Sequence, residues 1–139
     1  MPEDKRLAYN RMLPGMQAFK AILQNMQLKL MIGNVSSIGR NDVHTFINDL
    51  IYYVYFVQDE NNNPFAGLFV RSVIGLLTSV NSIILHLNTA KLLAEDLERI
   101  DTTTPNYAAA RATTYMEFQR YLLACQEPLN QALALFTIH

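Results

Sequence analysis

Charged residues are scarce in this chain. Of its 139 residues, 17% are Asp, Glu, Lys or Arg, whereas about 25% is usual in a soluble protein. The formal net charge is −1, and the basic residues are scattered from Lys5 to Arg120. A nucleic-acid-binding protein concentrates positive charge on one surface, because contacts with phosphate dominate its affinity. The sequence therefore predicts that nucleic acid is not a partner.

Uncharged polar residues take the place of the missing charges. Half of the residues are hydrophobic, and Asn, Gln and Thr are frequent among the others. Amides and hydroxyls cost less free energy to desolvate than ions do. A surface of this kind tolerates contact with another protein.

Cysteine is nearly absent, since Cys125 is the only one. A single cysteine excludes an intrachain disulfide and a Cys-rich zinc site, and it suits a reducing compartment. The first residues, Met1 to Arg6, are charged and are not followed by an apolar segment, so we expect no secretion signal. These features predict a cytoplasmic protein.

One apolar window, residues 65–87, is long enough to span a bilayer. It contains Arg71, Asn81 and His86, and a charged side chain at membrane depth is costly. We therefore interpret the window as a buried helix and expect no membrane span.

Motifs of catalytic and cofactor-binding sites are also missing. The sequence has no Gly-rich phosphate loop, no Gly-x-Ser-x-Gly elbow and no Glu-x-x-His pair of the di-iron bundles. Cys125 falls on an apolar stripe, which predicts a buried, unreactive thiol. The acidic residues Glu95, Asp96 and Glu98 have no histidine near them in sequence and are interpreted as a solvated helix end. We expect neither a cofactor nor a metal site, and we favour a non-enzymatic role.

Apolar residues recur at three- and four-residue steps along most of the chain, a period typical of α-helices. Pro14-Gly15 should end the first helix, Asn41 and Thr104 should cap later ones, and Pro128 should kink or break the last one. The expected helices comprise residues 3–13, 15–32, 41–58, 65–100 and 105–138. The sequence thus predicts one all-α domain over residues 1–139, a helical bundle of four to five helices.

The helix expected over residues 65–100 carries apolar residues at both core positions of five heptads, as in a coiled coil. The first set is Ala66, Val73, Val80, Leu87 and Ala94, and the second is Phe69, Leu76, Ile83, Ala90 and Leu97. A short turn joins this helix to the one expected over residues 105–138. The two should form a long antiparallel hairpin at the C-terminal end of the bundle.

Two helices of fewer than 20 residues cannot cover a hairpin whose helices are each about 35 residues long. Residues 3–13, a fold-back at Pro128 or a second chain would have to cover the excess, and a symmetric dimer is the commonest solution. We therefore expect a homodimer or a higher oligomer, and we expect Tyr53→Glu to weaken association without unfolding the monomer. The expected interface comprises the aromatic side of the helix over 41–58 and the far ends of the hairpin: Tyr52, Tyr53, Tyr55, Phe56, Leu97 and Phe136.

A polar cluster runs from Arg40 to His44, where the helix over 41–58 begins. Residues four apart share a helix face, and this Arg-polar-His pattern loosely resembles the signature of the HEPN superfamily. Members are small helical domains, often dimeric, and many are metal-independent ribonucleases. The resemblance implies that Arg40 stabilises phosphate charge and that His44 acts as a general acid or base. The alternative is a loop arginine beside a surface histidine.

Ser72, Ser79 and His86 recur every seven residues along the helix over 65–100. They are either a polar track beside a cavity or the flank of a helix seam. If His86 is partly buried, it needs a hydrogen-bond partner, and it could sense pH or contact a ligand.

Three functional hypotheses follow from these observations. The leading one is a non-enzymatic protein-association module, either a subunit of a homo-oligomeric assembly or a small adaptor or inhibitor that docks on another protein. The second is a HEPN-like ribonuclease. The third is a helical bundle that holds a small apolar ligand near His86.

Overall fold

The computed structural model describes residues 2–60 and 66–138, and most of them are helical. The prediction of an all-α bundle that ends in an antiparallel hairpin is confirmed. The elements in chain order are α1 (Glu3–Lys29), the 3-10 turn η1 (Val35–Ser37), α2 (Arg40–Glu60), α3 (Ala66–Phe69), α4 (Val73–Arg99), α5 (Tyr107–Ala124) and α6 (Gln126–Leu133).

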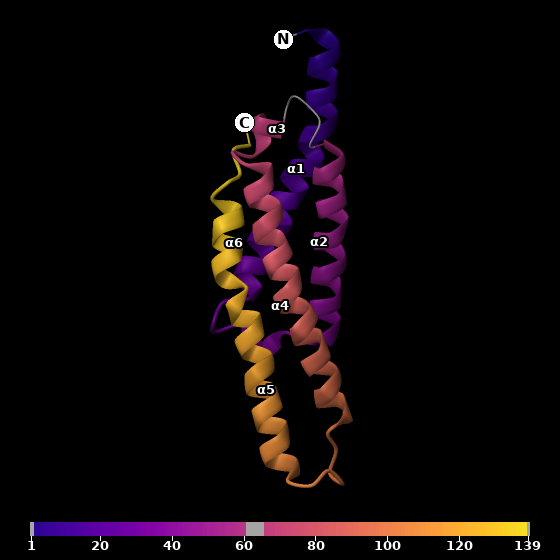
Figure 1. The fold of residues 1–139 in the computed structure, drawn as a ribbon, viewed down its shortest axis with the longest axis vertical. Helices are drawn as coiled ribbons and strands as arrows, with labels where there is room; N and C mark the ends of the chain where they lie inside the picture. Colours follow the sequence, from indigo (N-terminus) through magenta and orange to yellow (C-terminus); the bar gives the residue numbers. More distant parts are fainter. Residues whose placement is uncertain (1, 61–65, 139) are drawn as a thin grey trace.

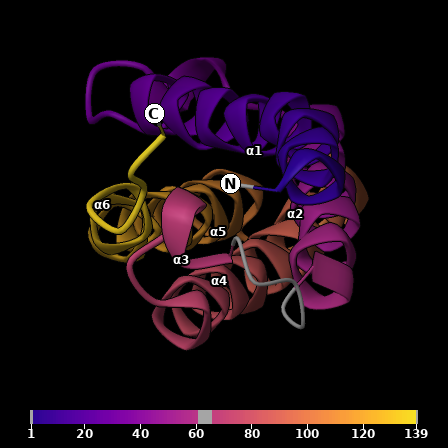
Figure 2. The same ribbon diagram turned by 90° about the horizontal axis from the view of Figure 1, so that it is seen from above.

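The long helices run alternately down and up around a shared core (Figure 1). Each helix packs antiparallel to its neighbours, in the order α1, α2, α4 and then α5 with α6, which together form the fourth column (Figure 2). In Figure 1 the lower part of the α4–α5 hairpin extends beyond the ends of α1 and α2. The fold is therefore an elongated four-column bundle with a protruding end.

The predicted break at Pro14-Gly15 is wrong, because α1 continues through both residues. Pro14 removes one helical hydrogen bond, but Met12 and Met16 on either side are buried in the core. Gly15 lies directly against the ring of Phe56 on α2, where an added Cβ would come 2.5 Å from Cζ. Packing of this stretch onto α2 thus offsets the helix-breaking tendency of the two residues.

The predicted helix over 65–100 is interrupted at residues 70–72, so Ala66 and Phe69 do not lie on α4; Asn61–Phe65 lie outside the described residues. Ser72 caps α4, because its hydroxyl accepts a hydrogen bond from the Gly75 N–H at 3.0 Å. The connector pairs with the last residues: the N–H of Arg71 donates to the Leu135 carbonyl, and that of Thr137 to the Phe69 carbonyl. A side-chain cap and a backbone pairing therefore divide what periodicity alone presents as one helix.

The expected break in the last helix is present and lies at Cys125, three residues before Pro128. Thr104 does not cap α5. Its hydroxyl accepts from the Asp101 N–H inside the preceding turn, and hydrogen bonds from Thr103 lower the pKa of the Asp101 carboxyl. Helix α5 follows Asn106, which adopts the left-handed conformation with φ 54°.

Asn41 is not a cap either, because α2 already begins at Arg40. The N–H of Gly39 donates to the Asp42 carboxylate at 2.8 Å. An acidic third residue that reaches back in this way is one half of a capping box. Helix α2 thus begins one residue before the helix predicted over 41–58.

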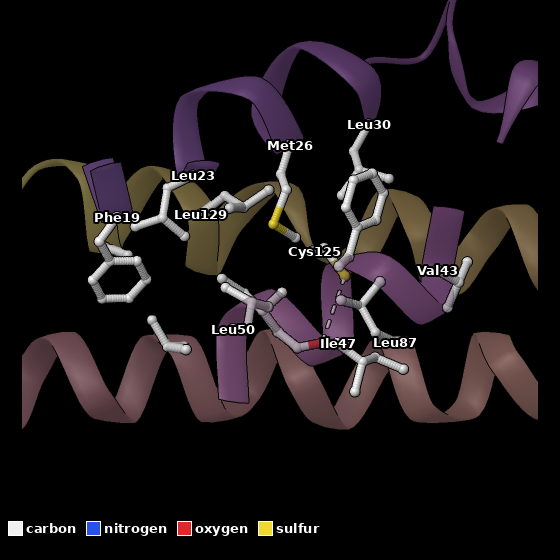
Figure 3. Close-up of a cluster of buried hydrophobic side chains, with 14 of the residues drawn as sticks. Phe19, Leu23, Met26, Leu30, Val43, Ile47, Leu50, Leu87, Cys125 and Leu129 are labelled. Atoms are coloured by element: carbon white, nitrogen blue, oxygen red, sulfur yellow. Dashed lines mark hydrogen bonds between the residues drawn. The ribbon is translucent and has the colours of Figure 1, made fainter. Parts of the chain in front are cut away.

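The core is a continuous layer of side chains between the four columns (Figure 3). Helix α4 contributes the predicted heptad positions, and Leu76, Val80, Ile83, Leu87, Ala90 and Ala94 are all buried. The Cys125 thiol points at the Ile83 carbonyl, with 3.9 Å between sulfur and oxygen. Burial raises the pKa of this thiol to about 12, so it stays protonated at ordinary pH, as expected of an unreactive cysteine.

Candidate functional site

A second stripe of side chains follows the outer side of α4, away from the core. Ile74, Leu85 and Leu92 are exposed at 78%, 66% and 62%, and with the exposed residues Thr78, Asn81 and Asn88 they form a stripe of six, beside which Ser82 is also exposed. The six residues are separated by steps of 4, 3, 4, 3 and 4, the alternation of the two core positions of a heptad. None of the six is charged. The outer side of α4 therefore has the spacing of a helix seam but no helix on it.

The neighbouring helix α2 adds exposed apolar surface. Tyr52 and Tyr55 are exposed at 65% and 64%, and Ile51 at 39%. The other exposed residues on this helix between Asp42 and Asp59 are His44, Thr45, Asn48 and Gln58. Helices α2 and α4 lie side by side (Figure 2). The outer surface of each helix is almost free of formal charge.

Two of the four α2 aromatic residues that are expected at an interface point inward instead. The ring of Tyr53 stacks on Phe19 of α1, with centroids 5.0 Å apart and planes 6° apart, and burial raises the pKa of the Tyr53 hydroxyl. Phe56 packs against Gly15. Of the predicted set on α2, only Tyr52 and Tyr55 lie on the surface, so Tyr53→Glu is not a test of association that spares the fold.

The two residues predicted at the far ends of the hairpin also have structural roles in the monomer. Phe136 is only 8% exposed, and its ring meets Phe19 edge to face at 5.7 Å. The C-terminal segment that carries it folds back on the α3–α4 connector, which the sequence pattern did not indicate. Leu97 is half-buried against the core. Phe136 is thus part of the core, and Leu97 offers little surface.

Arg40 lies at the lower end of α2 and forms an ion pair with Glu98 of α4 at 2.6 Å. His44 is exposed, and within the part of the chain that the structure describes it has no ion pair or hydrogen bond. Arg40 lines a shallow, open hollow with Leu97, Arg111 and Tyr115. Its charge is balanced by a carboxylate, so nothing in the surroundings of Arg40 or His44 adds to the ribonuclease hypothesis.

Ser72, Ser79 and His86, spaced by seven residues, lie in three different environments. Ser72 caps the helix, Ser79 is buried in the core, and His86 is half-buried with its ring 6.4 Å from that of Tyr121 on α5. They do not line one polar channel, so the ligand hypothesis gains no site from them.

Two further properties of the described residues bear on function. No three His, Cys, Asp or Glu side chains among them lie close enough together to hold a metal ion. Helix α4 is the one described helix that is long and apolar enough to cross a membrane, a test that the core helix of a soluble protein also passes. In the structure α4 packs against α2, α5 and α6.

No family model, curated protein or solved structure matches the chain.

Proposed function

We propose that this chain is a non-enzymatic protein-association module, and that its partner is a further copy of itself. The outer side of α2 and α4 supports this proposal most directly. Six large apolar side chains are exposed there: Ile51, Tyr52, Tyr55, Ile74, Leu85 and Leu92. From Ser72 to Ala90 the chain contains no Asp, Glu, Lys or Arg at all.

Single exposed apolar residues are common on soluble proteins and need no explanation. Here they recur with heptad spacing on one helix, and further exposed apolar side chains lie on the helix packed beside it. Burying such a surface stabilises a complex by roughly 25 cal/mol for each Å² of apolar area removed from water, and no ion has to be desolvated along most of it. A two-fold homodimer is the commonest way to bury a surface of this kind. A cytoplasmic location remains part of the proposal.

Light scattering over a range of protein concentrations tests the proposal. We expect wild-type protein to show the mass of a dimer or a larger assembly, and Leu85→Glu to shift it to the monomer, because a carboxylate would have to be desolvated in the contact. Met116→Glu is the matched control. Met116 is exposed at 68% on α5, so the same charge enters a comparable apolar position away from the stripe and should leave the mass unchanged.

The result that contradicts the proposal is wild-type protein that stays monomeric at every concentration. Equal loss of mass in Leu85→Glu and Met116→Glu would keep self-association but move the contact away from α4.

A further inference from the structure

The proposed self-association can be given a definite geometry, which rests on the proposed function. We infer that two copies pair antiparallel along the outer stripe of α4 (Ile74, Thr78, Asn81, Leu85, Asn88 and Leu92), with a two-fold axis at the level of Ile83. The inference comes from the spacing of this stripe, from the charges at its two ends and from the hydrogen-bonding capacity of its polar members.

The spacing of the stripe reads the same in both directions about residue 83. Reversing α4 around this point exchanges Ile74 with Leu92, Thr78 with Asn88, and Asn81 with Leu85. In antiparallel coiled coils the two core positions of the heptad face each other in this way. In a two-fold contact, residue i meets residue j and residue j meets residue i. One copy of the stripe is therefore complementary in register to a second, reversed copy.

The pairing places the large apolar side chains together at both ends of the contact. Ile74 of each copy meets Leu92 of the other, and these two side chains are exposed at 78% and 62%. Leu85 meets Asn81 near the centre. Half-buried Ile84, on the flank of the stripe, lies beside the axis and close to its own copy.

Charges at the two ends of α4 favour the antiparallel direction. Arg71 immediately precedes the cap of the helix and is exposed, and one of its guanidinium nitrogens also donates to the Ala134 carbonyl. Glu95 lies on the continuation of the stripe at the other end and is half-buried. Reversal about residue 83 brings Arg71 to the level of Glu95 in the second copy, whereas a parallel pair would place like charges side by side. The helix dipoles also oppose each other in the antiparallel pair.

Polar members of the stripe fix the register rather than the strength of the contact. The Thr78 hydroxyl already donates to the Ile74 carbonyl at 2.8 Å, so its burial leaves no unpaired donor. The amides of Asn81 and Asn88 have to find partners across the contact. A polar residue at a core position of a coiled coil selects the register in which it is satisfied, at some cost in stability. A reversible dimer of one defined register follows.

Site-directed cross-linking tests the geometry. Thr78→Cys and Asn88→Cys are made separately in the full chain, because the native Cys125 is fully buried, and are treated with a short bismaleimide. Each residue lies opposite the other one in the pair, while copies of the same residue lie ten positions apart, about 15 Å along the helix. We expect the mixture of the two variants to give several times more covalent dimer than either variant alone. Ser82→Cys, one residue from the axis, should cross-link to its own copy.

Three other results overturn the inference. Efficient cross-linking of Thr78→Cys alone and of Asn88→Cys alone would show a parallel pair. A dimer by light scattering without cross-linking in the mixture or in Ser82→Cys would keep the proposed function and move the contact elsewhere. A monomer at every concentration would remove both proposals, and its cosedimentation with phosphatidylcholine vesicles would reassign the stripe to a lipid surface.

Discussion

Helix α4 carries two stripes with the same heptad spacing, one facing the core and one facing outward. The inner stripe comprises Leu76, Val80, Ile83, Leu87, Ala90 and Ala94, all apolar and all buried. The outer stripe combines three Ile and Leu residues with three Thr and Asn residues, and its members are exposed. Spacing alone therefore does not separate a permanent contact from a surface, whereas the share of polar residues at the repeating positions does.

This difference has a physical basis. A contact that forms once, during folding, gains from every apolar side chain because it never has to return to water. A surface that must also exist in the free monomer limits its exposed apolar area, because large patches promote aggregation. The asparagines and threonine of the outer stripe are consistent with a contact that forms and dissociates.

Alanine substitutions should show the largest difference between the two faces of α4. Leu87 is fully buried, and Leu87→Ala should lower the free energy of unfolding by about 2–5 kcal/mol, since it leaves a cavity. Leu85→Ala removes the same atoms from the outer face. It should change the free energy of unfolding by less than about 0.5 kcal/mol in dilute, dissociated protein. Urea titration measures both. Equal losses at the two positions would mean that the outer stripe is buried within the monomer.

Alkaline pH provides a second test, of whether the inner face is closed to water. The unfolded chain ionises Cys125 near pH 8.5, but burial keeps the folded-state pKa at about 12. The resulting stabilisation is complete below pH 8.5 and is lost as the pH rises, by up to about 1.4 kcal/mol per pH unit. Urea titrations between pH 8 and 10.5 should therefore show a steeper loss for wild type than for Cys125→Ala. Parallel curves would mean that the thiol is accessible to solvent.

The smallest effect is expected at the edge of the outer face, where Arg40 pairs with Glu98. Both side chains are about half exposed, and water screens an ion pair of this kind. Arg40→Gln should change the free energy of unfolding by less than about 0.5 kcal/mol in 0.15 M salt, as measured by urea titration. A loss of several kcal/mol would indicate that the pair locks α2 to α4.

The inner stripe could be predicted from the sequence because a buried helix face repeats every three or four residues, whatever its neighbours. The breaks could not be predicted in the same way. The continuity of α1 through Pro14 depends on its contact with α2, and the interruption at residues 70–72 depends on pairing with the C-terminal segment. Both are tertiary effects that override local propensity. The type of each element could thus be predicted from the sequence, whereas boundaries that depend on tertiary contacts could not.

The candidate site was predicted only in part, for a related reason. Low charge and exposed aromatic residues indicated an association surface, and Tyr52 and Tyr55 are on the surface as expected. Tyr53 and Phe56 are not, because α1 covers that side of α2. The outer stripe of α4 was overlooked although its signal, a second heptad at Ile74, Leu85 and Leu92, can be read from the sequence.

Gly15 and Phe56 meet so closely that neither can change alone without a cost. A methyl group at position 15 would collide with the tip of the ring, so a larger residue there requires either a shift of the ring or a smaller residue at position 56. Among sequences that share this fold, the two positions should therefore covary, with glycine accompanying an aromatic ring and alanine or serine accompanying a shorter aliphatic side chain. Such a pair would mark the α1–α2 crossing as a constraint on the divergence of the fold, independent of any function on its surface.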